Sequence, residues 1–239
     1  MKILVVDDEP VSREALAELA EAAAGQPPSV ATDGRAAWAR LDGGEAVGLV
    51  LSEIRLPRLS GVELVARMRA DPRFEHLPVM LVSSAHDREA VESAMQAGIQ
   101  GFVLKPVMHG TLERVRHVMD RFRQALVERN TQAMTRLGVD PCRFDAYVAA
   151  LVTQGQVLAD RLAGAVKAQE ERLFQELKVA VKTQRVVAST LGANKLVPVL
   201  AWLEKCLESA SERGGLPQAL AAYRLNLYWL QCVTQAMPA

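Results

Sequence analysis

Cysteine is scarce in this sequence, and neither sign of charge is in excess. The three cysteines, Cys142, Cys206 and Cys232, form no CxxC spacing, so neither a disulfide framework nor a zinc site is expected. The 28 Lys and Arg residues equal the 28 Asp and Glu residues, which gives a formal net charge of zero. Because nucleic-acid-binding domains usually carry a basic excess, no nucleic-acid partner is expected.

Long apolar segments and glycine-rich phosphate loops are also missing. The N-terminus, MKILVVDDEP, passes from a few apolar residues directly to two aspartates, which leaves no apolar core for a signal peptide. No uninterrupted apolar run elsewhere is long enough to span a bilayer. No nucleophile–base pair and no phosphate-binding loop indicates an enzyme. We therefore expect a cytoplasmic, non-enzymatic protein without a membrane partner.

Five short apolar runs in the first half predict β-strands. They lie at 2–6, 28–32, 48–52, 78–83 and 101–105. Segments with helical spacing of apolar residues alternate with these runs, which predicts a parallel sheet with helices on both faces. In such sheets the functional crevice lies outside the carboxyl ends of the strands. Five polar residues stand at these ends: Asp7, Asp8, Glu53, Ser83 and Lys105.

The second half of the chain predicts helices alone. A helix is expected to begin near Thr111, and its apolar residues recur at steps of three, four or seven up to Leu137. This stripe predicts one of two structures. It is either the last helix of the α/β domain, packed on the sheet, or an extended helix that also pairs two chains.

The segment GVDP at 138–141 marks a break, because Gly commonly ends a helix and Pro commonly begins one. Beyond it lie four amphipathic segments, near 142–167, 170–191, 194–212 and 217–236. Four helices joined by short connections form an up-and-down bundle. The chain has 239 residues, of which 50% are hydrophobic, so it is long enough for an α/β domain followed by a four-helix bundle.

Residues 1–125 resemble the receiver domain of two-component response regulators. The resemblance rests on VVDDE with Asp7 and Asp8, on EIRLP with Glu53, on LVSSA with Ser83, and on GFVLKP with Phe102 and Lys105. It implies a flavodoxin-like, doubly wound parallel sheet of five strands. It also implies that Asp7, Asp8, Glu53 and the backbone carbonyl of Arg55 hold Mg²⁺, the only cofactor expected. Ser83, Phe102 and Lys105 would then form the phosphate pocket and its switch.

Glu53 departs from the receiver pattern, which has an aspartate as phosphoacceptor at this position. Glutamate carries its carboxylate on one more methylene, and a displacement of about 1 Å can cost on the order of 100-fold in a positioned reaction. Its charge also lies nearer to the place of a phosphoryl group, which it imitates in part. Three interpretations follow. The domain is a pseudo-receiver with a fixed state, a docking module that has lost phosphorylation, or a normal receiver with an introduced Asp-to-Glu exchange.

Residues 177–209 resemble the histidine phosphotransfer (Hpt) domain. The shared frame is a helix, the sequence LGA at 191–193, and a second helix with LE at 203–204. On this frame the phosphorylated histidine falls on Lys182. All four histidines of the chain lie at or before His117, so the second half has no imidazole nucleophile. The resemblance implies a degenerate Hpt-like bundle over 141–239, joined by a helical linker over 126–140 to the receiver.

One face of the expected helix at 170–191 is basic. Lys178, Lys182, Arg185 and Ser189 are spaced by four, three and four residues, so they share this face. The face is either merely solvated or a docking surface. In the second case its charge complements the acidic pocket of a receiver, in another protein or in this chain itself.

We therefore expect a response regulator that acts by phosphorylation-independent protein–protein interaction, with the bundle as docking or output domain. The alternative is a phosphorylatable response regulator, with Glu53 atypical or introduced, whose bundle is the phosphorylation-controlled output domain. The expected partner is another signalling protein: a histidine kinase, a receiver or Hpt protein, or a downstream effector. Pairing with a second copy of the chain, as a homodimer, is the remaining alternative.

Overall fold

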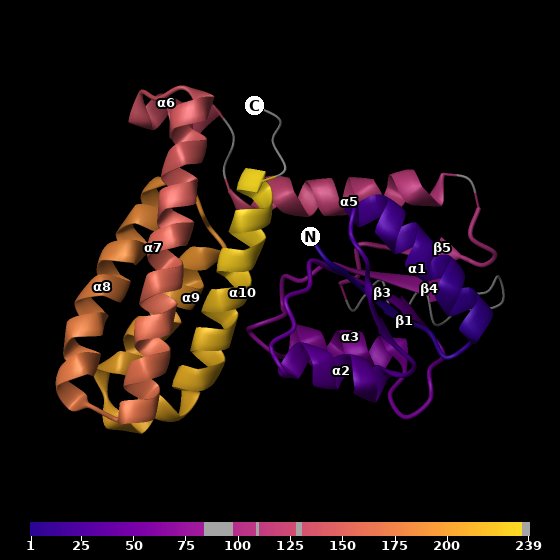
Figure 1. Ribbon diagram of the computed structural model, residues 1–239, viewed down its shortest axis with the longest axis horizontal. Coiled ribbons are helices and arrows are strands. Elements are labelled where there is room, and N and C mark those ends of the chain that lie inside the picture. Colours follow the sequence, from indigo (N-terminus) through magenta and orange to yellow (C-terminus); the bar gives the residue numbers. More distant parts are fainter. Residues whose placement is uncertain (84–97, 109, 128–130, 236–239) are drawn as a thin grey trace. The chain divides into compact units, whose positions relative to one another are not determined.

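The computed structural model describes residues 1–83, 98–108, 110–127 and 131–235 (Figure 1). The chain divides into two compact units, Met1–Phe122 and Arg123–Ala239. Of the linker expected over 126–140, residues 128–130 lie outside the described part.

Five parallel strands form one sheet in the first unit. The strands are β1 (Ile3–Val6), β2 (Ser29–Ala31), β3 (Leu49–Glu53), β4 (Val79–Ser83) and β5 (Gly101–Leu104). Their order, β2-β1-β3-β4-β5, confirms the flavodoxin-like fold. In the register, Val6 lies opposite Ser52, and Glu53 lies opposite Val82. The carboxyl ends of the three central strands therefore meet at one edge of the sheet.

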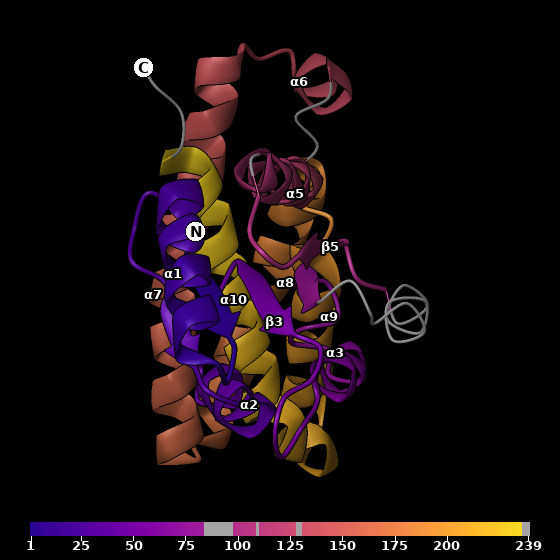
Figure 2. The same ribbon diagram turned by 90° about the vertical axis from the view of Figure 1, so that its right-hand side faces the viewer.

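Helices cover both faces of this sheet. They are α1 (Pro10–Ala24), α2 (Gly34–Asp42), α3 (Gly61–Arg69) and α5 (Thr111–Leu126). Figures 1 and 2 show α1 and α5 on one face and α2 and α3 on the other. Every residue of β1, β3 and β4 is buried, as expected for parallel strands that are covered from both sides.

The start and end of α1 follow from local chemistry. The Glu9 carboxylate accepts hydrogen bonds from the backbone N–H groups of Val11 and Ser12, and Pro10 occupies the first helical position. At the other end, Gly25 adopts a left-handed conformation with φ 69°, which closes the helix. The helix thus begins three residues after Asp7, which places the first acidic residue of the crevice beside its N-terminus.

The apolar stripe of α5 is buried within a single chain. Val115, Met119 and Leu126 are at most 1% exposed, and Phe122 is 7% exposed. The helix ends at Leu126, and a separate helix, α6, occupies Thr131–Leu137. Of the two alternatives, the extended helix is therefore wrong, and the apolar stripe of α5 is buried as expected for the last helix of the α/β domain.

The second unit is helical throughout its described residues, and Figure 1 shows four of its helices as an up-and-down bundle. These are α7 (Pro141–Ala168), α8 (Glu171–Thr190), α9 (Leu196–Glu208) and α10 (Leu216–Gln235). The expected break at 138–141 is confirmed. The Asp140 carboxylate caps α7 by accepting from the backbone N–H of Arg143, and Pro141 begins the helix.

The third helix of the bundle is shorter than the sequence predicts. It was expected over 194–212, but α9 ends at Glu208 because Ser209 is extended, with φ −139° and ψ 151°. A short 3₁₀ helix, η1 (Ala210–Gly215), follows and leads directly into α10. The apolar spacing continues through Ser209, so periodicity alone did not show the break.

A small polar cluster lies inside the bundle. The Gln184 amide of α8 donates to the Leu151 carbonyl of α7 (3.0 Å) and accepts from the Tyr223 hydroxyl of α10. Gln184 is 6% exposed and Tyr223 is fully buried. Gly155 of α7 leaves the space into which these two side chains pack. The cluster therefore ties three helices together, since each buried polar group has a partner.

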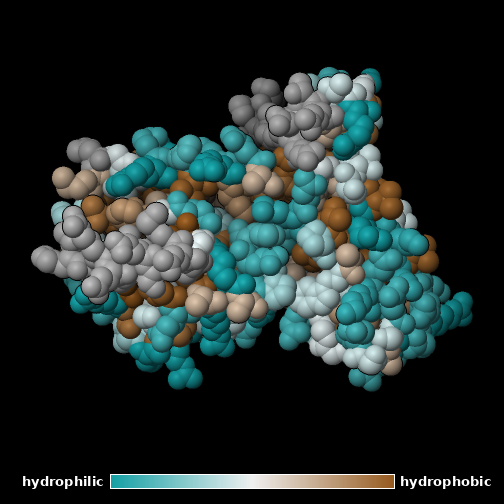
Figure 3. Space-filling model, turned by 180° about the vertical axis from the view of Figure 1, so that it is seen from behind, coloured by the Kyte–Doolittle hydropathy of each residue, from teal (hydrophilic) through white to brown (hydrophobic). Residues whose placement is uncertain are grey.

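The face shown in Figure 3 is mainly hydrophilic, with small separate hydrophobic areas. In the described part of the chain, no helix is both long and apolar enough to cross a membrane.

Candidate functional site

The strand ends bring together an acidic pair and a lysine. Asp7 follows β1, Glu53 is the last residue of β3, and Lys105 follows β5. The Lys105 ammonium lies 2.9 Å from Asp7 Oδ2 and also contacts Glu53 Oε2. Asp7 is fully buried and Glu53 is 7% exposed. Three residues separated by up to 98 positions in the chain thus form one ion-paired cluster at the carboxyl ends of the strands.

The Glu53 carboxylate is held at both of its oxygens. Oε1 accepts hydrogen bonds from the backbone N–H groups of Ile54 (2.8 Å) and Arg55 (3.3 Å). Oε2 pairs with Lys105. The side chain therefore turns back onto its own loop, and both oxygens have charge or dipole partners. A buried carboxylate needs such partners, because an unpaired buried charge is costly.

Asp7 is held in a similar way. Its Oδ1 accepts from the backbone N–H of Glu9 (2.9 Å), and Oδ2 accepts from the Ser12 hydroxyl (2.7 Å) in addition to Lys105. Ser12 was not selected from the sequence. Its position in the first turn of α1, five residues after Asp7, is the signal that could have identified it.

The two carboxylates govern the protonation of Lys105. Burial alone lowers the pKa of its ammonium group, but hydrogen bonds to Glu53 and Asp7 and their negative charges outweigh this effect and raise the pKa above its usual value. Lys105 is therefore cationic at neutral pH. Two like charges about 4 Å apart repel by roughly 4 kcal/mol at an effective dielectric of 20. The ammonium relieves this repulsion between Asp7 and Glu53.

Asp8 stands apart from this cluster. Its side chain is exposed, and the Arg13 guanidinium donates to the backbone carbonyls of Asp7 (3.0 Å) and Asp8 (3.2 Å). The residue types of the pocket fit a hard cation such as Mg²⁺, which prefers carboxylate and carbonyl oxygens. Among the described residues, however, no three acidic, histidine or cysteine side chains converge as ligands. Glu53 is turned towards Ile54 and Lys105 instead.

Ser83 and Phe102, the two expected switch residues, lie on neighbouring strands. Ser83 ends β4 and is fully buried, with its position paired to Leu104 of β5. Phe102 is half-buried and lines a hollow of about 700 Å³ between β4, β5 and α5. The residues directly after Ser83 lie outside the described part of the chain.

The loop after Glu53 is fixed by close packing. Gly61, the first residue of α3, lies so near the Glu53 carbonyl that an added Cβ would be 2.2 Å from its oxygen. The helix itself begins with reciprocal hydrogen bonds between Ser60 and Glu63. Arg58 has a left-handed backbone, with φ 67°, and its guanidinium pairs with the buried Asp33 (2.8 Å). The motif EIRLPRLSG therefore positions Glu53 through its backbone as well as its side chain.

The basic face expected on α8 is partly neutralised. Lys178 pairs with Glu208 (3.2 Å), and Arg185 pairs with Glu204 (3.0 Å), both of α9. Lys182 and Ser189 are exposed, and Lys182 has no ion-pair partner within the described residues. The two α9 carboxylates were missed, because they are close to α8 only in the folded bundle. The free positive charge of this face is therefore concentrated at Lys182.

Known proteins resemble the first unit. The family described as the response regulator receiver domain matches residues 3–116. The chemotaxis protein CheY of Pseudomonas aeruginosa is 34% identical over 122 residues, which cover 51% of this chain and 98% of that protein. The chemotaxis protein CheY-3 of Vibrio cholerae is 32% identical, with 51% and 93% covered.

Solved structures include a response regulator receiver protein from Pseudomonas putida. It shares 31% identity and has a TM-score of 0.44, with 48% of this chain and 94% of that chain covered. The CheY relative from Pseudomonas aeruginosa, by comparison, is 34% identical and is covered over 98% of its length. By this similarity the chain belongs to the response regulator receiver domain family of two-component signalling.

Proposed function

We propose that the receiver unit is a pseudo-receiver, which regulates other proteins by binding them without being phosphorylated itself. One observation carries the proposal: the Glu53 carboxylate is held at both oxygens, by two backbone N–H groups and by Lys105. A phosphoacceptor oxygen must be free to attack phosphorus in line. The longer glutamate side chain instead completes a permanent ion pair, which fixes one state of the pocket.

Mg²⁺ is not required for this fixed state, because Lys105 already supplies a positive charge to Asp7 and Glu53. If the cation binds, Asp7 and Asp8 are the residues that would hold it, together with Glu53 and the backbone carbonyl of Arg55. Its contribution would be to neutralise the negative charge of the acids and of an incoming anionic group.

The test is to incubate the full-length protein with Mg²⁺ and a small-molecule phosphodonor, in parallel with the Glu53→Asp variant. The parent protein is expected to acquire no acid-labile phosphate. The variant is expected to become labelled, since aspartate restores the phosphoacceptor residue of the receiver pattern, while Ser83 and Lys105 are retained. Intact-mass measurement detects the added phosphoryl group. The Glu53→Ala variant, which has no carboxylate at this position, gives the background.

Labelling of the parent protein at Glu53 would favour the second function, a phosphorylatable regulator whose bundle is the controlled output domain. The retained hydroxyl of Ser83 and the retained ammonium of Lys105 are the observations that favour this alternative.

We also propose that the helical bundle is a docking domain. As a degenerate Hpt-like domain without histidine, it would present Lys182, with Lys178, Arg185 and Ser189 around it, to the acidic pocket of a receiver in another protein or in this chain. The positive charge of Lys182 would orient and accelerate that association.

Charge reversal on this face tests the assignment. The variant with Lys182→Glu and Arg185→Glu is expected to bind a labelled receiver protein at least about tenfold more weakly, because the new carboxylates repel its acidic pocket. Isothermal titration calorimetry at two salt concentrations measures the dissociation constants of the variant and of the parent protein. Since Arg185→Glu places a second carboxylate beside Glu204, the single variant Lys182→Glu is measured as well.

The matched control reverses two exposed charges elsewhere in the bundle, Lys167→Glu and Arg172→Glu. Equal affinities for the control and for Lys182→Glu would remove Lys182 from the docking face. This outcome leaves the phosphodonor experiment unaffected.

A further inference from the structure

Exposed aliphatic side chains occur on two neighbouring helices of the bundle, α7 and α8. Eight large hydrophobic residues are exposed among the described residues, and four of them are valines on α7 and α8. They are Val157 (59% exposed), Val179 (67%), Val186 (60%) and Val187 (37%). Valine is a weak helix former, so exposed valines gain nothing from helix propensity. Exposed aliphatic side chains that lie together on a surface are typical of a site that binds another protein.

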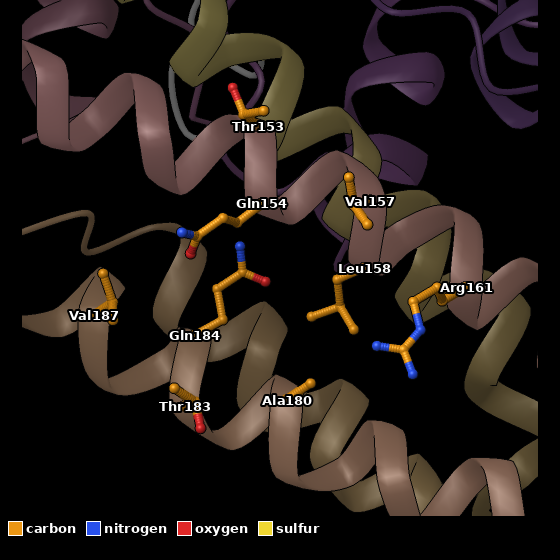
Figure 4. A pocket seen from close by; sticks show the side chains of 9 residues that line it. All are labelled: Thr153, Gln154, Val157, Leu158, Arg161, Ala180, Thr183, Gln184 and Val187. Atoms are coloured by element: carbon orange, nitrogen blue, oxygen red, sulfur yellow. The ribbon is translucent and has the colours of Figure 1, made fainter.

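An open groove of about 410 Å³ runs between α7 and α8, and two of these valines, Val157 and Val187, line it (Figure 4). Figure 4 shows side chains of both helices along its two walls, with the Arg161 guanidinium extending from α7 towards α8. The groove is lined by Thr153, Gln154, Val157, Leu158, Arg161, Ala180, Thr183, Gln184 and Val187. Most of these side chains are small or aliphatic. Because Val157 and Val187 remain exposed, the groove is too open to enclose a small ligand, but it can accept a row of side chains from a helix.

The charge in the groove is positive. Arg161 is the one charged residue in its lining, and it has no ion-pair partner among the described residues. The nearest carboxylates along these helices are already engaged: Asp160 pairs with Arg224 (2.8 Å), and Glu176 pairs with Arg172 (3.4 Å).

We propose that this valine groove, formed by α7 and α8, binds an amphipathic helix of a partner protein that carries aliphatic side chains on one face and carboxylates along its edges. The aliphatic row fills the groove between Val157 and Val187, and carboxylates at the edge of the helix pair with Arg161. A second copy of this chain fits less well. A two-fold interface places the same patch against itself, and here that brings cations together.

Two designed helical peptides serve as probes for the full-length protein. Both carry leucines at helical i, i+3, i+4 and i+7 spacing; one has glutamates on the flanks, and the other has lysines. Fluorescence anisotropy is expected to show at least about tenfold tighter binding of the glutamate peptide, with an affinity that falls as salt is added. Hydrogen exchange is expected to show protection along 153–161 and 180–187.

Two variants with the same positions and opposite charges provide the matched comparison. One carries Val157→Glu and Thr183→Glu, and the other carries Val157→Lys and Thr183→Lys. Glutamate and lysine are both better helix formers than the residues they replace, so both variants should fold. The glutamate variant is expected to bind the glutamate peptide at least about tenfold more weakly than the lysine variant does.

Four results would overturn the proposal. Three of them are equal affinity for both peptides, binding of neither peptide, and protection confined to other segments. The fourth is a dimer in sedimentation equilibrium whose groove is already protected from hydrogen exchange without peptide. The proposal goes beyond the pseudo-receiver function and does not depend on it. Labelling of Glu53 by a phosphodonor would leave the peptide measurements unchanged.

Discussion

The Gly61→Ala variant is expected to lose about 3 kcal/mol of unfolding free energy in the receiver unit. A Cβ at this position would be 2.2 Å from the Glu53 carbonyl oxygen and 3.1 Å from the Ser52 hydroxyl. The nearest obstacle is a backbone atom and not the end of a flexible side chain. Relief therefore requires a shift of β3 or of the N-terminus of α3, which are joined by the hydrogen bond from Gly61 N–H to the Ile54 carbonyl (2.9 Å).

Urea titration followed by hydrogen exchange of the β1 and β3 amides measures this loss in the full-length protein. The matched control is Gly101→Ala in β5, where the nearest atom to an added Cβ is the Met80 methyl at 3.5 Å, an ordinary contact. The control is expected to change the free energy by less than about 0.5 kcal/mol. If both variants are equally stable, the contact between Gly61 and Glu53 does not restrict the loop.

The second large effect is expected inside the bundle, where two glycines of α7 should respond to alanine in opposite directions. At Gly155, an added Cβ would be 2.6 Å from Leu227 Cδ2, 2.8 Å from Gln184 Nε2 and 2.9 Å from the Tyr223 hydroxyl. Gly155→Ala therefore displaces the polar cluster that joins α7, α8 and α10. We expect a loss of about 1–3 kcal/mol, since overpacking and a broken buried hydrogen bond both destabilise the fold.

The control on the same helix is Gly164→Ala. Gly164 is exposed, and an added Cβ would meet no atom within 4 Å. Alanine at an exposed helical site is favoured over glycine by roughly 0.5–1 kcal/mol, so this variant should be more stable than the parent. Thermal unfolding followed by circular dichroism distinguishes the two. A stable Gly155→Ala variant would mean that Gln184 and Tyr223 can repack without cost.

The sheet was predictable because parallel strands with both faces covered are short apolar runs. The runs at 48–52 and 78–83 became β3 and β4, shifted by one residue at their ends. The parallel arrangement then determined which polar residues meet, because the carboxyl ends of such strands share one edge. Helix ends were harder to predict. Ser209 ends α9 by its extended backbone, within a stretch whose apolar spacing is uninterrupted.

Side-chain geometry at the site could not be read from the sequence. Spacing placed Glu53 near Lys105, but it did not show that Oε1 would accept from the backbone of Ile54 and Arg55. That arrangement depends on a rotamer set by the packing around it. The free charge on the basic face of α8 could not be predicted either. Glu208 and Glu204 pair with Lys178 and Arg185 only when α9 packs against α8.

The valine groove escaped sequence reasoning for a different reason. Valines at helical spacing are usually core residues, so spacing alone does not show that Val187 of α8 stays exposed. The structure buries another face of α8 instead, through Phe174, Leu177, Val181 and Ala188. Which of two apolar stripes becomes the core is decided by the neighbouring helices.

The two strands that carry the Glu53–Lys105 ion pair differ in how firmly they are packed. Glu53 ends β3, a central strand whose five residues are all buried and whose neighbours are β1 and β4. Lys105 follows β5, which lies at the margin of the sheet and has one fully buried residue among its four. A force on this ion pair therefore displaces β5 more easily than β3. We therefore expect Glu53 to keep its position when a partner binds. Any displacement is expected in Lys105 and β5, the strand that contains Phe102.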